Sequence, residues 1–263
     1  MIGWVWLWLL IAVFAVLFLA LLWLVQRRTG DAGIADVGWS AGMGASALAC
    51  ALLAEGSAFH RAAVLLVGGV WSARLAYYIL KDRVLRGSED GRYQYLRELW
   101  GEKAQRNLFF FFQAQAVFII LFTAPFLLAV TRTDAPGWMD GLGILVGLGA
   151  VLGEAVADSQ LRRWRRNPDN RGKTCRGGLW RYSRHPNYFF EWCHWWAYPL
   201  LCAGTPAFWP ALLGPAVMLL FLFRLTGIPY TEKQALKSRG EDYRRYQRET
   251  SAFVPWFPKR SSP

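Results

Sequence analysis

The sequence has few of the features that mark secreted, metal-binding or disulfide-bonded proteins. Its four cysteines form no CxxC pair, and three lie in apolar blocks, so free buried thiols are favoured over disulfides or a metal site (Cys50, Cys175, Cys193, Cys202). The first residues, MIGW, lack a cationic region, and no small-residue cleavage site follows the first apolar block. We therefore expect a retained membrane helix at this end of the chain and no bound metal.

Charged side chains are also scarce, at 18% of residues, whereas hydrophobic side chains make up 54%. The apolar residues come in blocks about as long as is needed to cross a hydrocarbon core roughly 30 Å thick. Only helices satisfy every backbone polar group in lipid at these lengths, so the pattern predicts an all-α integral membrane bundle of about seven transmembrane helices. We expect one membrane-embedded domain, 1–263, with helices at 4–25, 34–54, 62–80, 108–130, 139–157, 187–203 and 207–225.

Acidic residues are outnumbered, because 18 Asp and Glu stand against 30 Lys and Arg, for a net charge of +12. This excess could indicate nucleic-acid binding, but most basic residues fall on one side of seven helices whose N-terminus is placed outside. Such a bias is the positive-inside pattern and predicts a cytoplasmic C-terminus, with the lipid bilayer and no nucleic acid as partner. The long polar segments 81–106, 158–186 and 226–263 then lie on the cytoplasmic side and concentrate the polar chemistry there.

Small residues recur within the block 141–153, GLGILVGLGAVLG. The spacing superficially resembles a dinucleotide fingerprint, but that motif needs a strand before it and a helix after it. Gly149 and Gly153, like Gly143 and Gly147, are four residues apart and therefore lie on one face of a helix. We expect them to let membrane helices approach each other closely.

Asp36 is an ionisable residue close to the start of the second apolar block. A carboxylate at that depth is costly unless it is protonated or partnered, so it is a candidate functional group. The alternative is a carboxylate at the beginning of the helix that reaches back to the interface or pairs with Arg27 or Arg28. The residues alone leave both interpretations open.

The third apolar block carries a second polar group. Arg74 shares a helix face with Tyr77 and Tyr78, which lie three and four residues further on. A phenol beside a cation has a polarised hydroxyl, which suits it to donate a hydrogen bond to a substrate oxygen. An aromatic belt with one snorkelling arginine is the alternative interpretation.

The segment 158–191 combines arginines with a polar start to the sixth helix. Arginine forks match phosphate oxygens, so a phosphate-bearing ligand is one interpretation of the arginines in 162–166, and a positive-inside flank is the other. In RHPNY, Pro186 suits a first helical turn, and the helix N-terminus beside Arg184 and Asn187 suits an anion. Glu191 follows one turn later on the same face, where a carboxylate is costly unless it is used.

The stretch CRGGLWRYSRHPNYFFEWCHWWAY, with DVGW, SEDGRY and TSAFVPW, resembles the steroid 5-alpha-reductase family in its bacterial membrane branch. The resemblance implies a seven-helix enzyme that uses NADPH to reduce the carbon–carbon double bond of an apolar enone, of the 3-oxo-5-alpha-steroid 4-dehydrogenase type. Hydride would reach the beta carbon of a 3-oxo-4-ene steroid or similar lipid, and the alpha carbon would be protonated. It also implies a bacterial cytoplasmic membrane and no obligate protein partner.

The same resemblance implies roles for single residues. Asp36 and Tyr78 would be catalytic, and Trp39, Arg74 and Tyr77 would line the substrate site. Arg92 and residues near the last three predicted helices would bind NADPH; the latter are Asp158, Arg162, Arg165, Arg184, His185, Asn187, Glu191, Arg224, Tyr230 and Glu232.

RHPNY also resembles a second class, the membrane methyltransferases of the isoprenylcysteine carboxyl and phospholipid type, which use S-adenosylmethionine. The dense arginines of 158–166 favour a multiply phosphorylated cofactor, so we expect the reductase. A non-enzymatic lipid-binding or scaffolding protein is the third possibility, but it would leave Asp36, Arg74 and Glu191 as unexplained charges in the membrane.

Overall fold

The computed structural model describes residues 2–85, 89, 91–225 and 227–259. Its regular elements are all helical, and within these described ranges no strand forms. Six of the described helices are long and apolar enough to cross a membrane, so the chain is a multi-pass integral membrane protein with an all-α fold, as predicted. Residues 86–88 and 90 of the predicted polar segment 81–106 lie outside the described residues, as do 226 and 260–263 of the segment that follows the last span.

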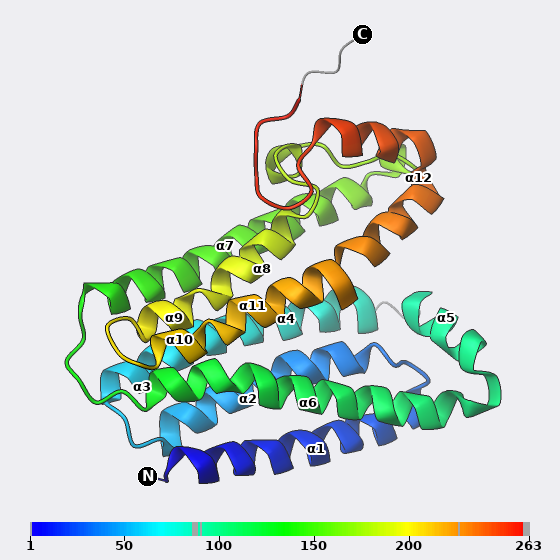
Figure 1. Ribbon diagram of the computed structural model, residues 1–263. Helices are drawn as coiled ribbons and strands as arrows, with labels where there is room; N and C mark the ends of the chain where they lie inside the picture. The colour runs from blue at the N-terminus through cyan, green and yellow to red at the C-terminus, as the bar shows by residue number, and fades with distance from the viewer. Residues whose placement is uncertain (1, 86–88, 90, 226, 260–263) are drawn as a thin grey trace. The chain divides into compact units, whose positions relative to one another are not determined.

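The chain forms two compact units, of which the first comprises Met1–Asp140 and Tyr198–Ala211. In Figure 1, helices α1, α2 and α6 of this unit run side by side. The elements that lie wholly in the first unit are α1 Trp4–Thr29, α2 Ile34–Leu53, α3 Ala58–Val64, η1 Leu65–Gly69, α4 Val70–Ile79, η2 Leu80–Val84, α5 Gly91–Trp100, η3 Gly101–Lys103, α6 Ala104–Val130 and α10 Phe208–Ala211. The π-helical turns η1 and η2 interrupt and end the third membrane segment.

Close packing in the first unit depends on small residues along α2. A side chain added at Gly38 would meet Leu22 of α1 at 2.3 Å, and one added at Gly42 would meet Ile119 of α6 at 2.4 Å. Membrane helices gain little from the hydrophobic effect against each other, so close contact of this kind supplies much of their attraction. The glycines of α2 therefore hold α1 and α6 close to it.

The second unit comprises Gly141–Ala197 and Leu212–Pro263. Its elements are most of α7 Trp138–Arg166, η4 Pro168–Asn170, η5 Gly178–Arg181, α8 Pro186–Trp195, α11 Leu213–Leu220, η6 Phe221–Leu225 and α12 Ile228–Glu249. The short α9 Ala197–Leu201 spans the boundary between the two units. The predicted helix 187–203 is thus present as two short helices, and the predicted helix 139–157 continues to Arg166.

Contacts within the second unit bring α7, α8 and α11 together. A side chain added at Gly153 would meet the ring of Phe190 at 2.4 Å, so this glycine lets α8 approach α7, as predicted. The same prediction is wrong for Gly149, where an added side chain would meet no described atom within 4 Å. The indole N–H of Trp192 donates to the carbonyl of Pro215 at 3.2 Å and joins α8 to α11. Trp180 of η5 donates to the carbonyl of Ala157 at 2.9 Å, which fixes the loop before α8 against α7.

Helix α12 is bent at Gly240, where φ is 52° and ψ is −123°. Only glycine adopts such a backbone conformation without strain. The bend divides the helix into a part that carries Glu232 and a part that carries Tyr243 and Tyr246. As a result, side chains from both parts face the loop that precedes α8.

Candidate functional site

The start of α8 is fixed by local backbone chemistry. Pro186 occupies the first helical turn, where its missing N–H would have had no helical partner. The backbone N–H of His185 donates to Ser183 Oγ at 3.1 Å, and Tyr246 donates its hydroxyl to the Ser183 carbonyl at 3.1 Å. Arg184 and His185 are therefore held in place before the helix begins.

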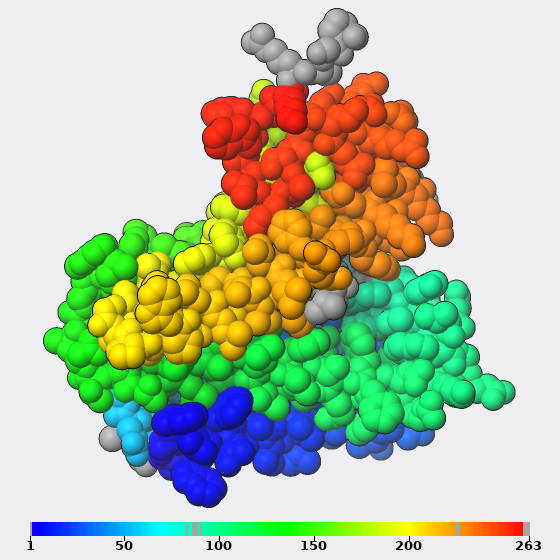
Figure 2. Space-filling model, in the orientation of Figure 1, coloured from blue at the N-terminus to red at the C-terminus, as the bar shows by residue number. Residues whose placement is uncertain are grey.

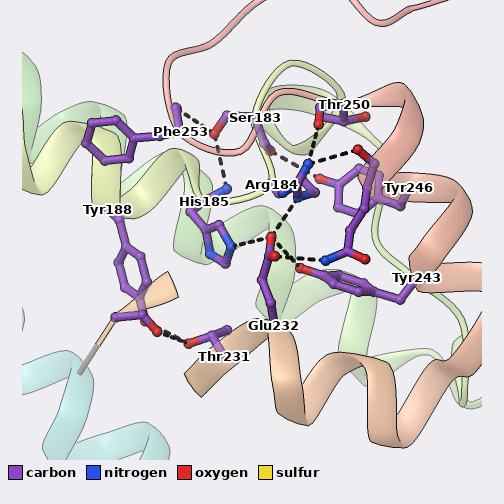
Figure 3. Close-up of polar contacts among 12 residues, drawn as sticks. Ser183, Arg184, His185, Tyr188, Thr231, Glu232, Tyr243, Tyr246, Thr250 and Phe253 are labelled. Atoms are coloured by element: carbon purple, nitrogen blue, oxygen red, sulfur yellow. Dashed lines mark hydrogen bonds and ion pairs between the residues drawn. The ribbon is translucent and has the colours of Figure 1, made fainter. Parts of the chain in front are cut away.

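Glu232 of α12 is the centre of a polar network at this helix start (Figure 3). Its Oε1 accepts from Arg184 Nε at 2.7 Å, from His185 Nε2 at 3.2 Å and, more weakly, from the Tyr243 hydroxyl at 3.4 Å. Its Oε2 accepts from Gln247 Nε2 at 2.8 Å. The network joins the loop before α8 to both parts of α12, and we call it the Glu232 cluster (Arg184, His185, Glu232, Tyr243 and Gln247).

Arg184 is held by more than the carboxylate. Its Nη1 donates to the carbonyls of Gln247 at 3.0 Å and Thr250 at 2.6 Å, and its backbone N–H donates to the Ser251 carbonyl at 2.8 Å. Charge-assisted hydrogen bonds of this kind are strong and directional. Arg184 therefore fixes the Glu232 carboxylate and the backbone of residues 247–251. Its Nη2 takes no part in these hydrogen bonds.

His185 is almost fully buried, and its ring is stacked on Tyr188 at a centroid distance of 5.4 Å. Burial lowers the pKa of His185 below its ordinary value, although the hydrogen bond to Glu232 opposes this shift. The imidazole is thus neutral at pH 7. Since a carboxylate only accepts hydrogen bonds, Nε2 carries the proton and Nδ1 has a lone pair available as a base.

Two further carboxylates contact or belong to α8. Asp158 of α7, a buried residue, accepts from Asn187 Nδ2 at 3.2 Å. Glu191, also buried, accepts from the indole N–H of Trp195 at 3.1 Å. The predicted residues Asp158, Asn187 and Glu191 therefore lie in one unit with Arg184, His185 and Glu232.

Four aromatic rings pack together beyond the polar start of α8. Phe253 contacts Phe223, Phe189 and Trp192, with ring centroids 5.2 Å, 5.7 Å and 5.8 Å away respectively. We call these four residues the aromatic cluster. It places π faces directly after the polar residues along α8.

The other arginines predicted to bind phosphate groups lie at the surface or are only partly buried. Arg165 is exposed at the end of α7, Arg224 is exposed in η6, and Arg162 and Tyr230 are partly buried. Arg176, not predicted as a site residue, donates to Asp242 Oδ1 at 3.0 Å and to Glu249 Oε2 at 3.1 Å. Burial raises the pKa of the neighbouring Cys175 thiol, which keeps it protonated.

The remaining predicted site residues lie in the first unit. Asp36 Oδ2 accepts from Arg92 Nη2 at 2.5 Å, and Oδ1 accepts from the hydroxyl of the buried Tyr93 at 3.0 Å. The pairing predicted with Arg27 or Arg28 is thus replaced by one with Arg92. Arg97 holds α5 nearby through Glu89, with Nε to Oε2 at 2.9 Å.

The predicted face shared by Arg74 and Tyr78 is present on α4. The Arg74 guanidinium carbon lies 5.4 Å from the centroid of the Tyr78 ring. Tyr77 is exposed and accepts from Lys81 Nζ at 3.0 Å. Trp39 of α2 packs edge-on against Trp71 at 5.7 Å and Phe122 at 6.1 Å.

Sequence reasoning missed Tyr243 and Gln247 of the Glu232 cluster, and Tyr93 beside Asp36. The first two lie 11 and 15 residues after Glu232, a separation typical of one helix face, but the bend at Gly240 alters that register. Tyr93 follows the predicted Arg92 directly, in a segment expected to form a short amphipathic helix at the interface, and this position was the signal that could have identified it. Tyr243 and Gln247 have no predicted site residue next to them in the sequence.

Comparison with known proteins identifies the family. The family described as "Protein of unknown function (DUF1295)" matches residues 22–250, so the chain belongs to that family. Over 78 residues the chain is 32% identical to Methanethiol S-methyltransferase 1 of Bradyrhizobium diazoefficiens. That match covers 30% of this chain and 25% of the relative, so it spans about a quarter of the relative's length. No solved structure matches.

These findings correct three linked predictions. The chain belongs to DUF1295 and not to the steroid 5-alpha-reductase family, and the named relative is a methyltransferase and not an oxidoreductase. NADPH-dependent reduction of an enone was therefore the wrong prediction, and so was NADPH as the cofactor. Two of the arginines predicted to bind NADPH, Arg184 and Arg92, pair instead with carboxylates of the chain. Counting arginines therefore overstated by these two the number available for phosphates.

Proposed function

We propose that this DUF1295 member is a membrane methyltransferase that uses S-adenosylmethionine to methylate a small apolar thiol. The named relative acts on methanethiol by its printed name, and this supports a thiol as the acceptor. The observation that carries the proposal is the charge balance at the start of α8. Three carboxylates, Asp158, Glu191 and Glu232, lie buried or half-buried there, together with Arg184 and with Arg239, whose guanidinium lies over the ring of Tyr243.

That balance fits a cationic ligand better than a polyanionic one. An excess of carboxylates would repel the phosphates of a dinucleotide, whereas it attracts the positive sulfonium and ammonium groups of S-adenosylmethionine. Glu232 Oε2 accepts one hydrogen bond from the described residues and has a lone pair for a second donor, such as an ammonium. Arg184 Nη2 and the N-terminus of α8 would hold the ligand's carboxylate.

The aromatic cluster supplies the other requirement. A sulfonium is attracted to the faces of Trp and Phe rings in the same way as a quaternary ammonium. Phe189 and Trp192 follow the polar residues by less than two turns of α8. We assign these two residues to the methyl-donor side of the site, together with Asn187 and Asp158.

S-adenosylmethionine, when bound, supplies a methyl group on a positively charged sulfur that a thiolate attacks. The chain must then produce the thiolate, since an alkanethiol is mostly protonated at neutral pH. Neutral His185 is suited to this step, because Glu232 fixes its Nε2–H and leaves Nδ1 to accept the thiol proton. Positioned bases of this kind contribute roughly 10² to 10⁴ in rate.

The first unit has no assigned chemical step in this proposal. The roles that the reductase resemblance gave to Asp36, Tyr78, Trp39, Arg74 and Tyr77 lapse with the reductase. We place the protein in a bacterial cytoplasmic membrane with the arginine-rich end of α7 facing the cytoplasm. The bacterial relative and the positive-inside pattern support this placement.

The proposal is tested with detergent-purified full-length protein. We expect S-adenosylmethionine or its demethylated product to raise the thermal unfolding temperature, and NADPH to leave it unchanged. Radiolabelled methyl transfer should then be measured with methanethiol, with an isoprenylcysteine carboxylate and with phosphatidylethanolamine as acceptors. Methylation of methanethiol alone supports the proposal, and methylation of either other acceptor replaces the thiol with that substrate.

Two variants of α12 locate the ligand site. Glu232→Gln should weaken binding of the methyl donor roughly 10- to 100-fold, because it removes a charge-assisted hydrogen bond. Glu241→Gln is the matched control, because Glu241 lies on the same helix but is exposed, and among the described residues it forms ion pairs only with Arg244 and Arg248. Equal affinity of both variants, or stabilisation by NADPH alone, would refute the proposed site.

A further inference from the structure

The last described residues of the chain, 250–259, form a loop without helix or strand, which we call the strap. It presents three large apolar side chains to the exterior. Val254 is 53% exposed, Trp256 is 70% exposed and Phe257 is 77% exposed. Figure 2 shows this part of the chain, coloured red, at the surface of the molecule.

The strap is nevertheless held firmly by its backbone. Ser183 Oγ donates to the Phe253 carbonyl at 2.7 Å, and the Trp256 N–H donates to the Tyr182 carbonyl at 2.9 Å. The Lys259 N–H donates to the Glu249 carbonyl at 2.8 Å. A backbone fixed in this way holds Val254, Trp256 and Phe257 at the surface. Exposure of such large apolar side chains to water is energetically unfavourable.

The exposed side chains continue an apolar surface of the last membrane segment. Leu220 of α11 and Phe223 of η6 are exposed on a helix long and apolar enough to span the membrane, and so contact lipid. The ring of Phe223 packs on Phe253 of the strap at 5.2 Å. The strap thus begins at the lipid-facing surface and extends it by Val254, Trp256 and Phe257.

The composition of the strap and its support is typical of a membrane interface. Tyr182 is partly exposed and packs edge-on against Phe257 at 6.1 Å. Arg181 and Lys259 are exposed beside these rings. Tryptophan and tyrosine gather at the level of lipid headgroups, and nearby cations are attracted to anionic lipids.

We propose that the strap is an interfacial anchor that lies in the headgroup layer of the bilayer, with Trp256 and Phe257 inserted at the acyl boundary. Its partner is an anionic lipid surface, recognised by two aromatic rings and by Arg181 and Lys259. Because the strap also binds Arg184 and Ser183 through Thr250, Ser251 and Phe253, the anchor fixes the loop before α8 at the membrane surface. This inference does not depend on methyl transfer.

The test places a spin label at Trp256→Cys in full-length protein reconstituted in nanodiscs of phosphatidylcholine and phosphatidylglycerol. Lys237→Cys is the matched control, because Lys237 is an exposed polar position of α12. Cys50, Cys175 and Cys202 are buried, and Cys193 is replaced by serine in both proteins. Thermal unfolding of each variant verifies that it is folded.

We expect the label at 256 to be several-fold more accessible to oxygen, which concentrates in lipid, than to a water-soluble nickel complex. The label at 237 should show the opposite preference. Nanodiscs without phosphatidylglycerol should reduce the immersion of the label at 256, which identifies the contribution of anionic headgroups. Equal nickel accessibility at 256 and 237 would show that the strap lies in water. Protection of 256 from both reagents would assign it to a second copy or a protein partner, and either result overturns the anchor.

Discussion

Two clusters in this protein are built from the same three kinds of residue. In the second unit, Glu232 pairs with Arg184 and His185. In the first unit, Asp140 pairs with Arg132 Nη1 at 2.7 Å and with His60 Nε2 at 3.2 Å, and we call these three residues the Asp140 cluster. Each cluster thus joins a carboxylate, an arginine and a histidine, but their surroundings differ.

The Asp140 cluster is filled by contacts of the chain itself. Its histidine is fully buried, and His60 Nδ1 makes a hydrogen bond of 2.7 Å with Ser57 Oγ. Asp140 Oδ2 accepts from the Gly137 N–H at 2.7 Å, and Arg132 Nη1 also donates to the Leu201 carbonyl. Both histidine nitrogens and both carboxylate oxygens therefore have partners within the unit.

The Glu232 cluster is the one to which we assign a ligand in the proposed function. The Glu232 side chain is 16% exposed, compared with 2% for Asp140. Nδ1 of His185 has no such serine partner, whereas Nδ1 of His60 does. The same residue types therefore do not identify a ligand site by themselves. A ligand site also needs hydrogen-bonding positions that the chain's own contacts do not occupy.

The largest expected effect is on stability. Asp140→Asn should lower the free energy of unfolding by about 3–5 kcal/mol, because it removes the buried charge partner of Arg132 and leaves only the half-exposed Asp134. Asp134→Asn is the matched control, since Asp134 contacts the same arginine but is 50% exposed, and its loss should cost less than about 1 kcal/mol. Denaturation in detergent measures both. Similar losses of unfolding free energy in the two variants would contradict a stabilising role of the Asp140 cluster.

The same substitution in both clusters should affect different properties. His185→Gln should reduce the rate of thiol methylation roughly 100-fold, because glutamine does not accept the thiol proton. His60→Gln should lower thermal stability but leave the rate per folded molecule unchanged. Radiolabelled methyl transfer and thermal unfolding, measured on both variants, decide between these outcomes. An equal loss of rate in the two variants would remove His185 from the proposed mechanism.

The pH dependence of methyl transfer gives the smallest effect. Burial lowers the pKa of His185, so its neutral form persists below the ordinary value of 6.5. The rate should therefore stay level as pH falls to 6.5 and then drop about tenfold per pH unit once the lowered pKa is passed. Stability contributed by the neutral buried ring is likewise complete above pH 6.5 and lost as pH falls through the lowered pKa. A rate profile unchanged in His185→Gln would disprove this assignment.

The membrane class and most helix positions could be predicted from the sequence. Apolar blocks of the required length determine spanning helices, because lipid offers no partner for backbone groups. The helix ends were less predictable: α7 continues to Arg166 because arginines are good helix formers, and charge alone does not end a helix. The prediction of a single domain and of the orientation in the membrane stays a prediction.

The candidate site was only half predictable. RHPNY and Glu232 were recognised, but the pairing of Arg184 with Glu232 joins residues 48 positions apart. The partners Tyr243 and Gln247 reach the carboxylate only because α12 bends at Gly240. Pairing of this kind depends on how helices pack, which no local pattern encodes.

The sequence by itself determined that the chain is a helical membrane protein with polar chemistry at the start of the helix that follows RHPNY. Apolar length and the energetic cost of charge in lipid act locally, so they are visible in a linear pattern. Only the tertiary structure decided which arginine pairs with which carboxylate, such as Arg184 with Glu232 and Arg92 with Asp36. That decision depends on distances between residues remote in sequence, because electrostatic interactions act through space and not along the chain.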